Sequence, residues 1–261
     1  MTPILSAAGD LAMTRTLAEK PLLALDFDGT LAPIVSDPSM ARTSGEIARL
    51  LSLLGNHLPV AIVTGRSVAD VEGRLGFSPQ FIVGNHGAEG LPGTAVNPLE
   101  ISIWRERIMT DFKASLEAAG VMIEDKGYSM SMHYRHAPDR EAARDLIHAT
   151  IMALAPAPRV IGGKCVVNLL PSGASDKFQA VNSLLRISGC RSVIFAGDDV
   201  TDDVVFEQAP DDWLTVRVEE ISNSRARFCL AVQAEMVIFL RRLLDFAVLA
   251  TDSRAERNPQ G

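Results

Sequence analysis

The chain has 261 residues, and its 32 acidic and 25 basic side chains give a net charge of −7 at pH 7. Hydrophobic residues make up 47% of the chain, so it can bury a full core without disulfides. The acidic balance argues against nucleic acid or a membrane surface as the partner, because both need a basic face, but it allows one basic pocket for a single anionic group.

The first third of the chain alternates buried strands with helices. The apolar runs 22–27, 59–63 and 81–83 are typical of strands covered on both faces. Residues 44–54 and 67–75, which lie between these runs, have helical periodicity. The alternation predicts a mostly parallel sheet with right-handed crossovers, whose ligands bind beyond the carboxyl ends of the strands.

The pattern changes after about residue 90. Residues 98–119 predict one long helix, and along residues 128–135 the side chains alternate, with methionine and tyrosine on one face. The opposite face is polar and consists of Ser129, Ser131, His133 and Arg135. A half-polar strand suits an antiparallel sheet with one solvated face, so we predict an inserted α/β cap domain at residues 89–167.

The parallel pattern resumes near residue 168. Residues 175–187 predict a helix, residues 192–196 a buried strand, and residues 234–249 the final helix. We therefore predict an α/β fold with a Rossmann-like parallel-sheet core, made of residues 1–88 and 168–261, into which the cap domain is inserted.

The cysteines and the chain ends bear on the cellular compartment. Cys165, Cys190 and Cys229 form no metal or redox motif, and we interpret them as buried thiols of a reducing compartment. No basic region followed by an apolar run opens the chain, and the apolar stretch 230–250 carries too many charges to span a bilayer. These features predict a cytoplasmic protein that does not enter a membrane.

Two of the strand ends carry aspartates. Asp26 and Asp28 follow the first strand, whereas Asp198, Asp199 and Asp202 follow a later one. If both strands are central, the carboxylates converge, and two of them about 4 Å apart repel by roughly 4 kcal/mol at an effective dielectric constant near 20. A cation or a shared proton must offset this repulsion, and oxygen ligands favour Mg²⁺ together with a substrate phosphate. The pattern therefore predicts a magnesium–phosphate site.

Each motif also has a plainer interpretation when it is taken alone. The Asp-x-Asp-Gly-Thr stretch at residues 26–30 fits an ordinary strand exit, Thr64 fits a strand-end hydroxyl, and Lys177 fits an exposed helix lysine. Their order along the chain favours a site, because Thr64-Gly65-Arg66 and then Lys177 stand between the two aspartate groups. Lys177 also lies near the start of a helix, where the helix dipole favours anions.

This ordered set of residues resembles the haloacid dehalogenase superfamily of aspartate-nucleophile phosphatases and, within it, the trehalose-6-phosphate phosphatase family. The narrower resemblance lies in residues 84–89, in Lys126 with residues 133–135, and in residues 197–202 with Phe206. It implies Mg²⁺-dependent hydrolysis of trehalose 6-phosphate to trehalose and phosphate through an aspartyl-phosphate. It also implies a small-molecule sugar phosphate as the ligand and a trehalose-6-phosphate synthase as a pathway partner.

The resemblance also implies roles for single residues. Asp26 is the expected nucleophile, and Asp28 the expected general acid and base. The expected ligands of Mg²⁺ are Asp26, the backbone carbonyl of Asp28, and Asp198. Thr64 and Lys177 are expected to hold the phosphoryl oxygens. Asp199 or Asp202 is expected to orient water or Lys177 without binding the metal ion itself.

The expected substrate-binding residues come from both parts of the chain. They are Gly65, Arg66, Asn85, His86, Gly87, Lys126, His133, Arg135 and Asn168. Three plainer alternatives stay open: a structural arginine at the start of a helix for Arg66, a satisfied loop histidine for His86, and simple solvent exposure for the strand face of His133 and Arg135.

The sequence departs from the family pattern on the last cap strand. The family usually has Glu–aliphatic–Arg–Pro there, and the Glu binds sugar hydroxyls, whereas this chain has Asn168, Leu169, Leu170 and Pro171. A neutral amide accepts weaker hydrogen bonds than a carboxylate does. The departure leaves another glycosyl or sugar phosphate open as the substrate.

Overall fold

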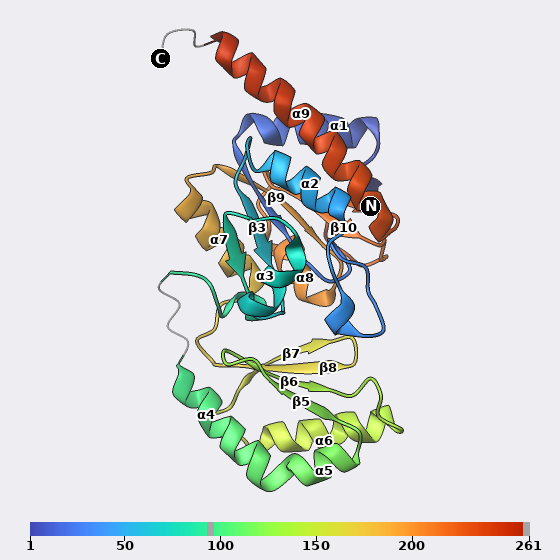
Figure 1. Ribbon diagram of the computed structural model, residues 1–261, viewed down its shortest axis with the longest axis vertical. Helices are drawn as coiled ribbons and strands as arrows, with labels where there is room; N and C mark the ends of the chain where they lie inside the picture. Colours follow the sequence, from blue (N-terminus) through green and yellow to red (C-terminus); the bar gives the residue numbers. More distant parts are fainter. Residues whose placement is uncertain (93–96, 258–261) are drawn as a thin grey trace.

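The computed structural model describes residues 1–92 and 97–257, with the backbone alone for residues 252–257. Two β-sheets stand one above the other, each with its own helices (Figure 1). The larger sheet has seven strands, all paired in parallel. In spatial order these are β1 (Thr2–Pro3), β11 (Phe228–Leu230), β10 (Leu214–Val218), β9 (Ser192–Gly197), β2 (Pro21–Leu25), β3 (Val60–Val63) and β4 (Phe81–Val83).

The two strands that precede the aspartate groups are neighbours at the centre of this sheet. Leu25 at the end of β2 pairs with Ala196 on β9, and the Asp26 amide donates to the Ala196 carbonyl at 2.9 Å. Both strands are completely buried, as their apolar runs predict. The carboxyl ends of β2 and β9 therefore bring the two aspartate groups to the same edge of the sheet, which confirms the condition set by the sequence.

Helices cover both faces of the parallel sheet. One apolar core joins the sheet to α1 (Ala7–Ala18), α2 (Gly45–Leu54), α3 (Val68–Leu75) and α9 (Met236–Arg257). A second core on the other face joins it to α7 (Lys177–Ser188) and α8 (Val200–Gln208). Within the described parts of the chain, no helix combines the length and the apolar character that crossing a membrane requires. This three-layer arrangement confirms the α/β fold and its parallel sheet.

The smaller sheet has four antiparallel strands, in the order β5 (Met122–Asp125), β6 (Met130–His133), β8 (Val166–Leu170) and β7 (Arg159–Gly163). Its helices are α4 (Pro98–Arg107), α5 (Lys113–Ala118) and α6 (Arg140–Met152), with a π-helical turn at Ile108–Phe112 between the first two. They lie on the side of the small sheet that faces away from the parallel sheet (Figure 1). The opposite side faces the carboxyl ends of the parallel strands.

Three details of the fold differ from the sequence expectations or extend them. The polar face of β6 is solvated only in part: Ser129 and Ser131 are 1% and 0% exposed and lie between the two sheets, whereas His133 and Arg135 are part-exposed. The edge strand β1 and its neighbour β11 were not expected, since neither is longer than three residues. Strand β8 continues to Leu170, across the predicted boundary between residues 167 and 168. The division into a core and a cap domain at those boundaries stays a prediction.

A buried arginine anchors the turn that follows β9. Arg217 on β10 is 1% exposed; its Nη1 donates to Asp203 Oδ1 at 2.5 Å and its Nη2 to the Asp198 carbonyl at 2.7 Å. The guanidinium also lies 5.8 Å from the centre of the Phe206 ring. The buried guanidinium of Arg217 thus fixes the position of the backbone that carries Asp198.

We expect Arg217→Met to lower the free energy of unfolding by about 2–4 kcal/mol, because Asp203 and the Asp198 carbonyl lose a buried partner. Urea denaturation measures the change. Arg225→Met, at an exposed arginine of the nearby loop, is the control and should change the value by less than about 0.5 kcal/mol. Equal losses in the two variants would show that Arg217 contributes no more than a surface side chain.

Candidate active site

A buried lysine joins two of the aspartates at the carboxyl ends of the central strands. Lys177 Nζ donates to Asp26 Oδ1 at 2.9 Å and to Asp202 Oδ1 at 2.7 Å. The three residues are 2%, 4% and 0% exposed. Lys177 is the first residue of α7, whose start is fixed by a capping box between Asp176 and Gln179. The exposed helix lysine that the sequence left open as an alternative is therefore wrong.

Two glycines let the acidic groups approach one another. A Cβ on Gly197 would lie 2.3 Å from Asp202 Cγ, and a Cβ on Gly29 would lie 2.0 Å from Asp198 Oδ2. Gly29 also has φ +77°, in the left-handed region that favours glycine. The Asp202 carboxylate therefore packs directly on the backbone of Gly197, and the Asp198 carboxylate on that of Gly29.

The cluster holds more negative than positive charge. Asp26, Asp198 and Asp202 each offer a carboxylate oxygen within 4.8 Å of the others, and Lys177 supplies the ammonium group among them. Burial, and then Asp202, raise the pKa of Asp198 to about 7. Burial also raises the pKa of Asp26 well above its ordinary value, against the attraction of Lys177. Lys177 stays protonated, because its two carboxylate partners raise its pKa more than burial lowers it.

This cluster fits a divalent cation through its oxygen donors. Asp202 is already committed, since its Oδ1 binds Lys177 and its Oδ2 accepts the backbone amides of Asp198 and Asp199 at 3.1 and 3.0 Å. Asp26 and Asp198 are the carboxylates left to bind an ion. The Asp28 side chain points to Arg66 instead, so only its backbone carbonyl remains as a further ligand.

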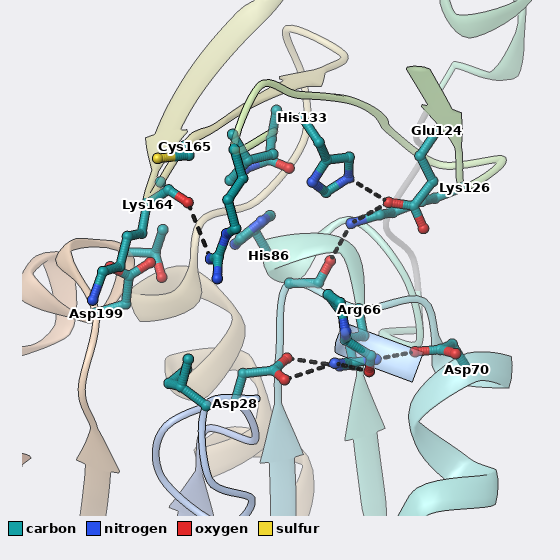
Figure 2. A pocket seen from close by; sticks show the side chains of 18 of the residues that line it. Asp28, Arg66, Asp70, His86, Glu124, Lys126, His133, Lys164, Cys165 and Asp199 are labelled. Atoms are coloured by element: carbon teal, nitrogen blue, oxygen red, sulfur yellow. Dashed lines mark hydrogen bonds and ion pairs between the residues drawn. The ribbon is translucent and has the colours of Figure 1, made fainter. Parts of the chain in front are cut away.

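Beside the cluster lies a cleft of about 270 Å³, lined by residues of both sheets (Figure 2). Nine of the residues named from the sequence line it: Asp28, Gly65, Arg66, His86, Lys126, His133, Arg135, Asn168 and Asp199. The cleft also contains side chains that the sequence did not assign to a site, notably Asp70, Glu124 and Lys164. Cys165 lines it as well and is only part-buried, so its interpretation as a buried thiol is wrong. The cap residues and the strand-end residues of the core therefore share one cavity.

On the core side of the cleft, Arg66 binds two acidic groups. Its guanidinium donates to both oxygens of Asp28 and to Asp70 Oδ2, with all three bonds at 2.7 Å. Hydrogen bonds from Arg74 and Arg66 lower the pKa of Asp70 although burial opposes them. Asp70 lies four residues after Arg66, a helical spacing from which the sequence could have identified it.

On the cap side, Lys126 and His133 flank an acidic residue. His133 Nε2 lies 2.8 Å from Glu124 Oε2, and Lys126 Nζ lies 3.7 Å from the same oxygen. The hydrogen bond with His133 lowers the pKa of Glu124, whereas burial lowers the pKa of Lys126. Lys126 Nζ also donates to the Gly65 carbonyl at 3.1 Å, which links the cap to the core. Glu124 stands two residues before Lys126, and this short spacing is the sequence feature from which Glu124 could have been identified as a site residue.

His86 forms a wall of the cleft with an unsatisfied nitrogen. The residue is 8% exposed, and its Nδ1 has no hydrogen-bond partner in the described structure. The ring packs so closely on Gly65 that a Cβ there would lie 2.4 Å from its Cε1. Burial, and then the nearby Lys177 and Lys126, lower the pKa of His86 well below its ordinary value. His86 is therefore a neutral imidazole, and the alternative of a satisfied loop histidine is wrong.

Seven residues named from the sequence do not line the cleft: Asp26, Lys177, Asp198 and Asp202 form the cluster beside it, and Thr64, Asn85 and Gly87 lie in the loops after β3 and β4. Thr64 Oγ1 accepts the Arg66 backbone amide at 3.2 Å. The Asn85 side chain donates to Glu89 and accepts from Ser129, so it joins the core to the cap. A Cβ on Gly87 would lie 2.8 Å from the carbonyls that precede α7, so this glycine lets the loop pack against the helix start. The contacts of Asn85 and Gly87 favour support of the site over direct contact with a ligand, whereas the Thr64 hydroxyl only accepts within the described structure and is still free to donate.

Two polar cap residues have partners within the cap. Asn168 Oδ1 accepts from Ser131 Oγ at 2.7 Å, and its Nδ2 donates to the Ile161 carbonyl at 3.3 Å. Arg135 Nη2 lies 3.4 Å from the Lys164 carbonyl. The amide of Asn168 is therefore occupied, while Arg135 keeps most of its donors for the cleft.

The fold and the strand-end residues define a class first. A parallel sheet that bears these aspartates, with a second small sheet over their edge, is the architecture of haloacid dehalogenase-type phosphatases. A solved trehalose-6-phosphate phosphatase related protein is 26% identical and superimposes with a TM-score of 0.71 over 87% of this chain and 99% of that one. The C-terminal domain of the Candida albicans trehalose-6-phosphate phosphatase has the same fold, with 23% identity and a TM-score of 0.75 over 94% and 98%.

Sequence comparison then gives the family. The chain belongs to the trehalose-phosphatase family, whose model matches residues 24–228. It is 35% identical over 215 residues to a bifunctional trehalose-6-phosphate synthase/phosphatase of Thermoproteus tenax, covering 77% of this chain and 29% of that protein. It is 32% identical over 228 residues to a trehalose-phosphate phosphatase of Mycobacterium leprae, covering 79% and 52%. The chain thus spans about half or less of the length of these two relatives.

The raised pKa of Asp198 gives a test of the charge cluster. Because the folded-state pKa of about 7 exceeds the ordinary 3.8, ionisation costs the metal-free protein stability as the pH rises between these values. At pH 8 without metal, we expect Asp198→Asn to be more stable than the wild type by on the order of 2 kcal/mol, and by pH 4 the gain should vanish. Urea denaturation at both values measures it.

Addition of Mg²⁺ supplies the control for that comparison. The ion should raise the unfolding temperature of the wild type at pH 8 and leave that of Asp198→Asn nearly unchanged, since binding to the folded state alone stabilises it. An Asp198→Asn variant that gains nothing at pH 8, or that responds to Mg²⁺ like the wild type, would contradict the metal assignment.

Proposed function

We propose that this protein is a Mg²⁺-dependent phosphatase that hydrolyses trehalose 6-phosphate to trehalose and phosphate through an aspartyl-phosphate on Asp26. The observation that carries the proposal is the buried contact of Lys177 with Asp26, with Asp198 within 4.8 Å, at the edge of a cleft that the cap closes on its far side. Membership of the trehalose-phosphatase family supports it.

The reaction proceeds in two displacements at phosphorus. In the first, an Asp26 oxygen forms a bond to phosphorus, the bond from phosphorus to the sugar oxygen breaks, and the leaving oxygen takes a proton from Asp28. In the second, water attacks phosphorus and gives a proton to Asp28, and phosphate leaves Asp26. Asp28 returns to its starting form, so atoms and protons balance over the cycle.

The other core residues hold the charges in place. Lys177 offsets the negative charge of Asp26 as it approaches the phosphate, and Asp202 fixes the direction of Lys177 through its 2.7 Å bond. Together with Lys177, Thr64 steadies the phosphoryl oxygens. Asp199 lines the cleft and orients water there.

The donor set fits Mg²⁺, because it consists of oxygen atoms in a cluster where three carboxylates share the single ammonium group of Lys177. The Asp26 and Asp198 carboxylates and the Asp28 backbone carbonyl would hold the ion. When bound, Mg²⁺ supplies positive charge that offsets both the nucleophile and the phosphate.

The cap and the loops around it select the sugar. Lys126, His133 and Arg135 offer donors to sugar hydroxyls, and Glu124 offers an acceptor in the same cleft. The remaining walls are polar or small, namely Gly65, His86 and Asn168. The Asn168 amide is bonded within the cap, so the usual family carboxylate has no direct substitute on that strand. This keeps another glycosyl or sugar phosphate as the alternative substrate.

A trehalose-6-phosphate synthase is the pathway partner that we propose to supply the substrate. The relative of Thermoproteus tenax carries both names, synthase and phosphatase, in one protein, which supports this pairing. The cytoplasmic location, where such a synthase would meet this protein, stays a prediction.

A substrate panel tests the function directly. In the presence of Mg²⁺, we expect faster phosphate release from trehalose 6-phosphate than from glucose 6-phosphate or other sugar monophosphates. Asp26→Asn should lower the release by about 10³-fold or more, since the covalent route is lost. Asp145→Asn, at an exposed aspartate of α6, is the matched control. Unchanged release by Asp26→Asn would exclude it as the nucleophile.

The role of the cap is tested with a second pair of variants. We expect Lys126→Met to lower kcat/KM for trehalose 6-phosphate about 10- to 100-fold, because a buried donor to the sugar is lost, and to lower that for 4-nitrophenyl phosphate less than about threefold. Lys113→Met, at an exposed lysine of α5, should change neither. Equal losses with the two substrates would assign Lys126 to the chemistry or the fold instead.

A further inference from the structure

The Asp28 carboxyl group, which the proposed reaction uses to exchange protons, is held by one side chain. Arg66 Nε donates to Asp28 Oδ2 and Arg66 Nη2 donates to Asp28 Oδ1, both at 2.7 Å (Figure 2). Two parallel bonds from a planar guanidinium fix the plane of a carboxyl group, which a single-point donor does not do. Asp28 follows β2 and Arg66 follows the adjacent β3, so the contact joins two neighbouring strand ends.

Arg66 is itself fixed by the structure around it. Its Nη1 donates to Asp70 Oδ2 at 2.7 Å, its Nη2 donates to the Pro38 carbonyl at 2.9 Å, and its guanidinium lies 5.3 Å from the centre of the Phe27 ring. A side chain held from three sides can hold another one in turn. Arg66 therefore provides a rigid support for Asp28.

The bonds of Arg66 leave little capacity for a substrate. The guanidinium has five N–H donors, and the hydrogen bonds to Asp28, Asp70 and Pro38 use four of them. A bidentate contact with a phosphate would need two adjacent free donors. The side chain of Arg66 is 12% exposed and that of Asp28 is 37% exposed, so the carboxyl group is the more open of the two to the cleft.

We propose that Arg66 is a positioning residue that acts through Asp28 and does not contact the substrate. It orients the carboxyl group that gives a proton to the leaving sugar oxygen and then accepts one from the attacking water. Arg66 keeps its own protons throughout. The inference rests on the proposed function, in which Asp28 is the general acid and base.

The test compares two leaving groups in single turnovers, with the protein in excess over substrate and Mg²⁺ present. The sugar oxygen leaves as an alkoxide that needs a proton, whereas 4-nitrophenolate is a stable anion and needs none. We expect Arg66→Lys to slow trehalose release about 10- to 100-fold and 4-nitrophenol release less than about threefold. Arg42→Lys, at an exposed arginine bonded to the Gly73 carbonyl, is the matched control and should slow neither.

A double variant separates action through Asp28 from independent action. In the Asp28→Asn background, Arg66→Lys should slow trehalose release by less than about a further twofold, because the group that it positions is gone. Thermal unfolding of each variant checks the fold, and Arg66→Gln replaces Arg66→Lys if the latter does not fold, with the same expectation.

The outcomes distinguish this proposal from the function on which it rests. Equal slowing with both substrates, or full additivity with Asp28→Asn, would overturn the positioning role while the wild type stays active. A wild type that releases no product from any phosphate ester would overturn the proposed function and the role of Arg66 together. If the wild type prefers another sugar phosphate, that compound takes the place of trehalose 6-phosphate and the comparison stands.

Discussion

The core depends on the contact of one buried ammonium group with carboxylates at the ends of two central strands. Lys177 is 2% exposed and bonded to Asp26 and Asp202, so its charge is stable only while both partners stay in place. Asp26 comes from β2, Asp202 from the first turn of α8, and Lys177 from the first residue of α7. One cluster thus fixes the relative positions of three elements that are distant in sequence.

The same cluster is short of positive charge, and this shortage is what suits it to a ligand. Three carboxylates lie within 4.8 Å of one another at the edge of an otherwise apolar core, and Lys177 alone does not balance them, so a further cation would stabilise the cluster. A site preorganised in this way favours a metal ion and then an anion bound to it. In the proposed reaction the phosphate therefore meets a site whose charges are already in position, while the cap supplies contacts to the sugar.

Two arginines support the loops around this cluster. Arg217 holds the backbone of the turn that carries Asp198, and Arg66 holds the Asp28 carboxyl group. Two contacts tie the cap to the same strand ends, from Ser129 to Asn85 and from Lys126 to the Gly65 carbonyl. The position of the cap is therefore linked to the loops that form the floor of the cleft.

The sequence predicts the parts that depend on local patterns, and misses those that depend on packing between distant segments. Apolar runs ending in aspartates predict the central strands and their meeting at one edge, because burial on both faces leaves a continuous apolar run that is visible in the sequence. The contact of Glu124 with His133 depends on strand pairing in the cap, and the burial of Ser131 on how the cap faces the core. Neither this contact nor this burial can be predicted from the pattern of a single sequence segment.

The need for a divalent ion among these carboxylates is tested most directly by diffraction from crystals soaked in Mn²⁺, which replaces Mg²⁺ and scatters anomalously. An anomalous peak is expected between the Asp26 and Asp198 carboxylates, within coordination distance of both and beside the Asp28 carbonyl. Mn²⁺ bound elsewhere on the molecule, with Lys177 alone among the carboxylates, would contradict the charge balance from which the function is inferred.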